Sequence, residues 1–325
     1  MRRTPISRRA FLAVGAAVVG GACTSGRAAP SSTSGAAPPS LTGPPPTTAP
    51  SSPSSTPTVP TTPPTVATTA APLAADPFTL GVASGDPDEH TAVVWTRLTA
   101  PDDSLPDEVD VVWEVAGDES FRRIHATGTL PATAADAHSV HAVVELDGAS
   151  WYRFRAGGWT SPAGRVTPAP GRHDGGELRL ATANCQHFAT GFYAAHRDIA
   201  EWRPDLVVFL GDFIYEDAAQ PLGPGRVRAH ADPEPTDLDG YRARYAQYLG
   251  DPQLQSSRAA CPWLVIWDDH EVENNYAGTV PENPADVNGF VARRAAAYRA
   301  WWEHMPLRLP PPPDGRPFPV HRRVA

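Results

Sequence analysis

Apolar and polar positions alternate in four short runs between residues 77 and 170. The runs are rich in valine and aromatic residues, and glycine, aspartate and proline separate them. A period of two with this punctuation is typical of strands that bury one face. The alternation predicts a small, fibronectin-like β-sandwich over residues 77–172. Its strands are expected at 91–97, 109–115, 139–146 and 151–156.

The pattern changes after Gly175, where apolar runs alternate with stretches of helical spacing. The run at 205–211 is apolar on both faces, as in a strand that helices cover on both sides. Strand, loop and helix in succession predict α/β architecture over residues 173–325, in which ligands gather beyond the carboxyl ends of the strands. The expected elements are strand 178–185, helix 191–202, strand 205–211, helix 238–249, a shorter helix ending near Ala260, strand 263–267 and helix 284–303.

Residues 1–23 follow neither pattern and have the features of an export signal. Arg8 and Arg9 precede a short apolar run and small residues that end at Cys23. This order is typical of a twin-arginine signal peptide. The apolar run is too short to span a bilayer as a stable helix. We therefore expect the twin-arginine export machinery as a partner and a secreted or cell-surface location.

The small residues before Cys23 indicate a possible lipoprotein cleavage site, but Gly20 stands where a leucine-like residue is usual. A lipid anchor through Cys23 and simple secretion therefore both stay open. Residues 24–76 consist almost entirely of proline, serine, threonine, alanine and glycine. Such a stretch buries too little apolar surface to offset the entropy lost on ordering, so a disordered linker is predicted there.

Charge narrows the classes of function. The net charge is −9, and the chain has no lysine, so its 27 strongly basic side chains are all arginine. A nucleic-acid-binding surface has to be basic because it neutralises phosphates, so this charge argues against such a surface. The 325 residues leave room for two packed domains beside the linker.

Three polar clusters follow the predicted strands of the α/β segment. They are Asn-Cys-Gln-His at 184–187, Gly-Asp-Phe-Ile-Tyr-Glu-Asp at 211–217 and Asp-Asp-His-Glu-Val-Glu-Asn-Asn at 268–275. Because parallel strands end on the same side of a sheet, the clusters should converge on one site although they are far apart in sequence.

The residue types in these clusters suit metal ions. Gly211 lets the backbone turn sharply, which leaves the Asp212 carboxylate at the strand end, where it can bridge two cations. Tyr215, three residues later, can ligate the same ion. Its phenolate and the Cys185 thiolate suit ferric iron, whereas the carboxylates of Asp212 and Asp269 suit either iron or a hard divalent ion. A mixed iron and calcium centre is therefore chemically reasonable.

Simpler explanations exist for the individual residues. A single cysteine at a strand end is more often a small buried apolar residue, and Tyr215 alone would be ascribed to packing. Cys185 could instead pair with Cys261 as a disulfide in an oxidising exterior. The run from Asp268 to Glu271 favours a metal site, because like charges crowded at a buried strand end need a cation to offset them.

Six motifs along the chain carry a family resemblance. They are Phe-Thr-Leu-Gly-Val-Ala-Ser-Gly-Asp-Pro at 78–87, Val-Val-Trp-Thr-Arg at 93–97, Asn-Cys-Gln at 184–186, Gly-Asp-Phe-Ile-Tyr-Glu at 211–216, Tyr-Arg-Ala-Arg-Tyr-Ala-Gln-Tyr at 241–248, and Trp-Asp-Asp-His-Glu-Val-Glu-Asn-Asn-Tyr at 267–276. These motifs resemble those of the PhoD-like alkaline phosphatase and phosphodiesterase family, which is a group of calcineurin-like metallophosphoesterases. The likeness runs from about residue 77 to the last residue, and its later motifs would rarely occur together by chance.

The resemblance implies an N-terminal β-sandwich, an αββα metallophosphoesterase domain and a centre of Fe(3+) and Ca(2+) ions. Cys185 and Tyr215 would ligate iron, and Asp212 would bridge iron and calcium. Asp269 would ligate the second metal. His270 would contact the phosphate or protonate the leaving alkoxide.

The implied activity is hydrolysis of small or polymeric phosphate monoesters, diesters or both by a metal-activated hydroxide. A phospholipase D-type phosphodiesterase on the same ligands stays open, and Asn274 and Asn275 either bind substrate oxygens or cap the loop. Family members continue beyond the position of residue 325, so we expect an incomplete αββα domain whose remaining ligands lie outside this chain. The rival hypothesis is a truncated, inactive exported lipoprotein that serves as a binding module.

Overall fold

The computed structural model describes residues 72–102, 104–171, 176–313, 318 and 320–322. The predicted signal peptide, Cys23 and residues 24–71 of the predicted linker lie outside the described residues. Within the described ranges, no helix combines the length and the apolar character that crossing a membrane requires.

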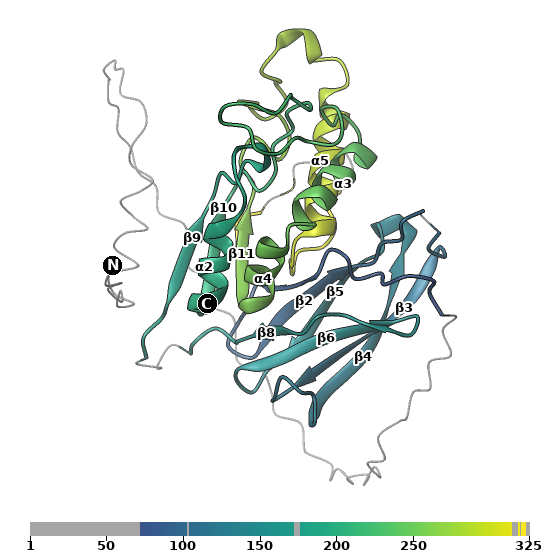
Figure 1. Ribbon diagram of the computed structural model, residues 1–325, viewed down its shortest axis with the longest axis vertical. Helices are drawn as coiled ribbons and strands as arrows, with labels where there is room; N and C mark the ends of the chain where they lie inside the picture. The colour runs from purple at the N-terminus through teal and green to yellow at the C-terminus, as the bar shows by residue number, and fades with distance from the viewer. Residues whose placement is uncertain (1–71, 103, 172–175, 314–317, 319, 323–325) are drawn as a thin grey trace, which may run out of the picture. The chain divides into compact units, whose positions relative to one another are not determined.

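Two β-sheets and a group of helices make up the mixed α/β fold (Figure 1). One sheet has six strands in the order β5-β2-β1-β11-β10-β9, and the other has the order β4-β3-β6-β7, with β8 also paired to β6. The strands are β1 (Val82–Gly85), β2 (Thr91–Arg97), β3 (Glu108–Ala116), β4 (Ile124–Thr133), β5 (Ser139–Glu145), β6 (Ser150–Ala156), β7 (Trp159–Thr160), β8 (Gly164–Val166), β9 (Leu180–Ala183), β10 (Leu206–Leu210) and β11 (Pro262–Ile266).

Two sheets pack against each other in the N-terminal part. Strands β1, β2 and β5 supply one side of this core, and β3 and β6 supply the other. Val94, Val111 and Phe154 are fully buried between them. The alternation did not predict β1 or β4. In β4 most residues are exposed or half-buried, so the strand carries little apolar signal.

The six-stranded sheet continues from the N-terminal part into the α/β segment. Strand β1 pairs antiparallel with β2 on one side and parallel with β11 on the other. Strands β9, β10 and β11 are parallel, in agreement with the α/β prediction. Consequently the polar clusters lie at the carboxyl ends of three neighbouring parallel strands. The N-terminal strands β1, β2 and β5 extend the same sheet.

The helices are α2 (Ala194–Trp202), α3 (Leu238–Leu249), α4 (Pro252–Ala260) and α5 (Phe290–His304), with short 3-10 turns η2 (Ala134–Asp136), η3 (Phe188–Thr190) and η4 (Pro284–Asp286). Asp237 and Asp251 cap α3 and α4 by accepting backbone N–H bonds, which fixes where these helices begin. The prediction of one helix from residue 284 was wrong, because Gly289 adopts a left-handed φ of 92° and α5 begins after it.

The helices and the six-stranded sheet share an aromatic core that contains Trp263, Tyr245 and Trp301. Val207 and Phe209 of β10 are fully buried in this core. On the opposite face of β10, Leu210 is 52% exposed. The expectation that helices cover both faces of this strand is therefore not met by the described residues.

Candidate metal centre

The carboxyl ends of β9, β10 and β11 meet, and the backbone itself joins the first two. The amide of Cys185 donates to the carbonyl of Gly211 (3.2 Å), and the amide of Gln186 donates to the carbonyl of Asp212 (3.1 Å). Cys185 and Asp212 both adopt a left-handed φ of 55°, which turns each chain sharply after its strand. These turns bring the side chains of Cys185 and Asp212 to the same side of the sheet edge.

Gly211 allows β10 and β11 to end side by side. Its φ is 95°, and a Cβ atom there would lie 2.5 Å from Cβ of Asp268 and 2.6 Å from its backbone nitrogen. No side chain fits at such distances, so the glycine of the Gly-Asp step is needed for close approach as well as for the turn.

The Asp212 carboxylate is the centre of the cluster. Its Oδ2 lies 3.2 Å from Sγ of Cys185 and 3.1 Å from the hydroxyl of Tyr215. Its Oδ1 is buried and has no hydrogen-bond partner. Since a buried carboxylate oxygen without a partner is energetically costly, this atom indicates a position that a cation would satisfy.

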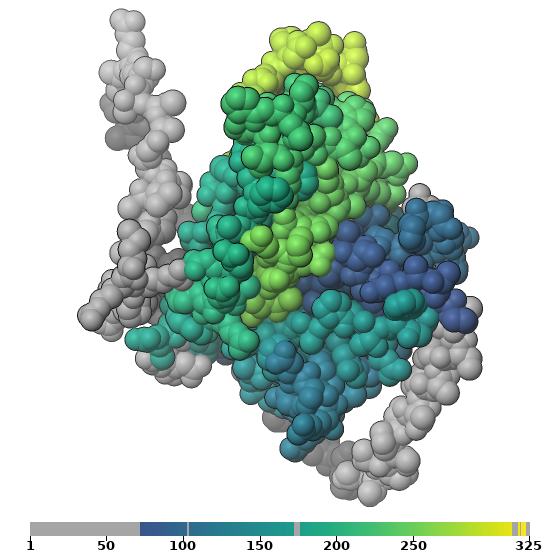
Figure 2. Space-filling view, viewed as in Figure 1, coloured from purple at the N-terminus to yellow at the C-terminus, as the bar shows by residue number. Residues whose placement is uncertain are grey.

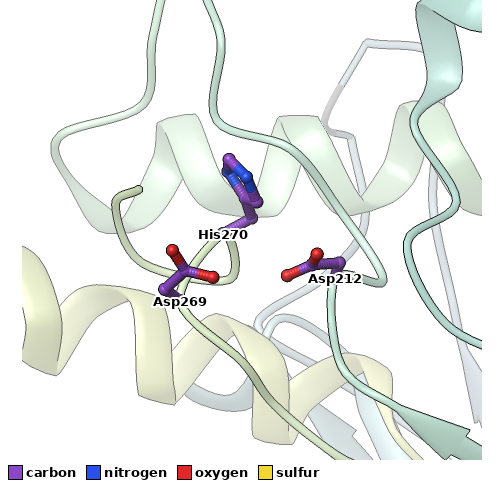
Figure 3. Close-up of side chains that lie close together, drawn as sticks. All are labelled: Asp212, Asp269 and His270. Atoms are coloured by element: carbon purple, nitrogen blue, oxygen red, sulfur yellow. The ribbon is translucent and has the colours of Figure 1, made fainter. Parts of the chain in front are cut away.

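Asp269 and His270 face the same carboxylate from the end of β11. One potential ligand atom from each of Asp212, Asp269 and His270 lies within 4.8 Å of the others. Figure 3 shows the two carboxylates pointing toward one another, with the imidazole beside them. All five residues predicted from the sequence, Cys185, Asp212, Tyr215, Asp269 and His270, therefore lie around one small space.

The Tyr215 ring is held between two imidazoles. Its centroid lies 4.4 Å from that of His187 and 4.1 Å from that of His270. Burial and the nearby charge of Asp212 raise the pKa of Tyr215 above its ordinary range. Burial and the Asp212 carboxylate likewise raise the pKa of the Cys185 thiol. Both groups therefore favour their neutral forms unless a bound cation stabilises the deprotonated thiolate and phenolate.

Glu216 holds the His270 ring in place. Its Oε2 lies 2.8 Å from Nδ1 of His270, and its Oε1 accepts the backbone amide of Asn274 at 2.7 Å. Partial burial lowers the pKa of His270, but the hydrogen bond and charge of Glu216 outweigh it and raise this pKa to about 9. The sequence motif contained Glu216, yet no periodicity or spacing signalled its contact with His270.

Asn274 and Asn275 direct their amide groups at a carboxylate of the same loop. Nδ2 of Asn274 donates to both carboxylate oxygens of Glu282 (2.9 and 2.8 Å), and Nδ2 of Asn275 donates to one of them (2.8 Å). The backbone amide of Asn275 also donates to Oδ2 of Asp269 at 2.5 Å. In this structure the pair braces the loop beside Asp269.

The loop between β11 and α5 stands out at the top of the space-filling view in yellow-green (Figure 2). It exposes the apolar side chains of Val280 (58%) and Val287 (55%) beyond the strand ends.

The two cysteines of the α/β segment do not pair. Both thiols are free, with Cys185 exposed and Cys261 buried in the aromatic core. The disulfide alternative is therefore wrong for this structure, because Cys185 turns toward Asp212 instead.

The sequence and the fold both have counterparts among known proteins. The PhoD-like phosphatase profile matches residues 180–325, and the profile of the PhoD-like phosphatase N-terminal domain matches residues 64–170. The chain is 46% identical over 273 residues to alkaline phosphatase D of Bacillus subtilis (strain 168), which covers 78% of this chain and 45% of that protein. A solved structure of PhoD superposes with a TM-score of 0.72 at 45% identity, covering 77% of this chain and 50% of that chain. The chain thus spans about half the length of the relatives that it matches.

Proposed function

Because the chain belongs to the PhoD-like phosphatase family, we propose that it provides part of an exported enzyme that hydrolyses phosphate esters at a metal centre. The single observation that carries the proposal is the convergence of Cys185, Asp212 and Asp269 from three different strand ends. Acidic groups crowded around the buried Asp212 carboxylate are costly without a cation. The partnerless Oδ1 of Asp212 supports the same conclusion.

The donor types divide the site into two halves. We infer that Cys185, Tyr215 and Asp212 hold Fe(3+), because thiolate and phenolate are strong anionic donors. Asp212 would bridge to Ca(2+), which Asp269 would also ligate through hard carboxylate oxygens. Bound there, the cations supply an activated water and offset the charge of the phosphoryl group.

The chain's own side chains would orient the substrate and move a proton. With Nδ1 facing Glu216, His270 has Nε2 left to donate a proton to the leaving oxygen. The Glu216 carboxylate favours the protonated imidazole, which is the form that a general acid needs. Asp212 and Asp269 cannot donate in this way while they ligate cations.

Further parts of the proposal concern location, substrate and fold class. Arg8 and Arg9 support export through the twin-arginine machinery, and Cys23 supports a possible lipid anchor. The substrate is proposed to be a small or polymeric phosphate monoester or diester. We further propose that the two packed N-terminal sheets are a fibronectin-like sandwich and that the α/β segment is the first part of an αββα domain.

The test uses the product of the complete gene, purified with its metals. It should release p-nitrophenol from p-nitrophenyl phosphate, from bis(p-nitrophenyl) phosphate or from both, and the ratio of the two rates identifies the preferred ester. Asp269→Asn should abolish most of this release. Asp239→Asn is the matched control, because that side chain is 92% exposed on α3. A folded, metal-loaded protein that releases no p-nitrophenol would favour the binding-module hypothesis.

A further inference from the structure

Glu271 is a buried carboxylate that touches both strand-end loops of the metal centre without facing the centre itself. The residue is 1% exposed. Its Oε2 accepts the backbone amides of Asp212 (3.0 Å) and Asp268 (2.7 Å), and its Oε1 accepts the amide of Phe213 (2.5 Å). One side chain thus ties the loop after β10 to the loop after β11.

All three bonds are made by backbone amides at the ends of the two strands. The amides of Asp212 and Phe213 follow the sharp turn at Gly211, so the strand ladder does not provide their acceptors. Leaving a buried amide without a partner costs roughly 1–3 kcal/mol. Among side chains of this size, only a carboxylate has two oxygens that both accept hydrogen bonds.

The consequence concerns the position of the predicted ligands. Asp212 carries its carboxylate on the same residue whose amide Glu271 binds, and Asp269 follows Asp268 directly. A shift of either loop therefore changes the separation of the Asp212 and Asp269 carboxylates. Groups that orient metal ligands in this way typically contribute about 10- to 100-fold to metal affinity.

We propose that Glu271 is a positioning residue that sets the spacing of Asp212 and Asp269 for metal binding. This inference rests on the proposed function, because it assumes that these two carboxylates ligate a cation. Both oxygens of Glu271 accept backbone amides, so its side chain is directed at the backbone of the loops. Its effect passes through the backbone of the two loops.

The alternative is that Glu271 only stabilises the core, and a matched variant separates the two roles. Glu303 is a fully buried carboxylate on α5. It binds Arg242 of α3 and Arg299 of α5, and neither arginine belongs to the two strand-end loops. Replacing it with glutamine should lower stability as well. It should leave the geometry of the two loops unchanged.

The experiment compares Glu271→Gln with Glu303→Gln in the product of the complete gene. Calcium is added back to chelator-treated protein in a calorimeter, and thermal unfolding is recorded in parallel. In Glu271→Gln an NH₂ group replaces one of the two carboxylate oxygens. This group is a hydrogen-bond donor, and it would face a backbone N–H, which is also a donor. We expect its calcium affinity to fall about 10- to 100-fold while Glu303→Gln binds calcium as the wild type does.

Wild-type calcium affinity in a folded Glu271→Gln protein would overturn the positioning role. If that variant does not fold, Glu271→Asp takes its place, because the shorter side chain cannot reach all three amides. Weaker calcium binding by Glu271→Asp supports the inference, and unchanged binding overturns it. A wild-type protein that binds no calcium contradicts the proposed function instead, so the two failures are distinguishable.

Discussion

Nδ1 of His270 lies 2.8 Å from Oε2 of Glu216, and this contact joins the ends of two neighbouring strands. Glu216 follows β10 and His270 follows β11, so the pair lies across the same edge as the candidate ligands. The second oxygen of Glu216 accepts the amide of Asn274. Both residues are therefore fixed by the fold before any substrate arrives.

Replacing Glu216 with glutamine should lower the rate of hydrolysis without preventing metal binding. The imidazole would lose the charge that raises its pKa, so less of it would be protonated at high pH. We expect kcat to fall about 10- to 100-fold with little change in KM. The alkaline limb of the kcat profile should also move to lower pH. Steady-state kinetics from pH 6 to 10 measure both effects, and an unchanged profile would contradict the role of the pair.

Replacing Tyr215 with phenylalanine should remove the colour of the iron-loaded protein. A phenolate bound to ferric iron gives a charge-transfer band in the visible range, and phenylalanine has no oxygen to donate. Cys185→Ser should keep a phenolate band but lower the iron content, because a serine hydroxyl is a weaker ligand than a thiolate. Absorption spectra and elemental analysis of both variants provide the measurement. A colourless, iron-free wild-type enzyme with full activity would refute both assignments.

The sequence was most informative where one physical rule decided the outcome. Strand β2 and helix α3 lie at the predicted residues, because a run of β-branched and aromatic residues and a helical spacing each leave few options. Strand β4 was not predicted because it is largely exposed. The last helix was predicted to begin too early, at residue 284, because the effect of Gly289 was not considered.

The site residues also divide into those that one physical rule predicts and those that it does not. Cys185 and Asp212 could be found because strand ends converge in any parallel sheet. Glu216 and Glu271 could not, because their partners are a side chain and backbone amides on other elements. Such contacts depend on the relative position of two loops, which local patterns do not contain.

Replacing Gly211 with alanine tests the close approach of the two strand ends. The new methyl group would meet the backbone of Asp268, and alanine disfavours a φ of 95°. We expect a loss of roughly 1–3 kcal/mol in the free energy of unfolding, together with weaker metal binding. Gly223→Ala is the control, since a Cβ there has no atom within 4 Å. Equal stability of the two variants in a urea titration would show that the strand ends are farther apart.

Acidification should destabilise the fold in a defined range. Burial lowers the pKa of His196 to about 4, against an ordinary value of 6.5. The unfolded chain therefore takes up this proton at a higher pH than the folded chain does. The free energy of unfolding should fall as the pH drops from about 6.5 to 4, by about 3 kcal/mol for this residue. Urea titrations across this range measure the slope.

A glutamine at position 196 supplies the control for that slope. It can still bond Ser257 or Gln186, which are the two partners of the buried imidazole. Because glutamine does not titrate, the pH dependence of the variant should be weaker by one proton. Burial also lowers the pKa of His141 to about 4, so part of the slope should persist. A slope equal to that of the wild type would contradict the assignment to His196.

The N-terminal sheets and the α/β segment should unfold as one unit, because the six-stranded sheet passes through both. Trp95 of β2 is fully buried in the aromatic core of the α/β segment, and its indole nitrogen donates to the carbonyl of Glu303 at 3.0 Å. A fragment of residues 77–172 would expose this side chain and leave β1 without its partner β11. We expect the fragment to give a poorly dispersed amide spectrum by nuclear magnetic resonance. Well-dispersed signals would show that the predicted boundary at 172 separates two independent domains.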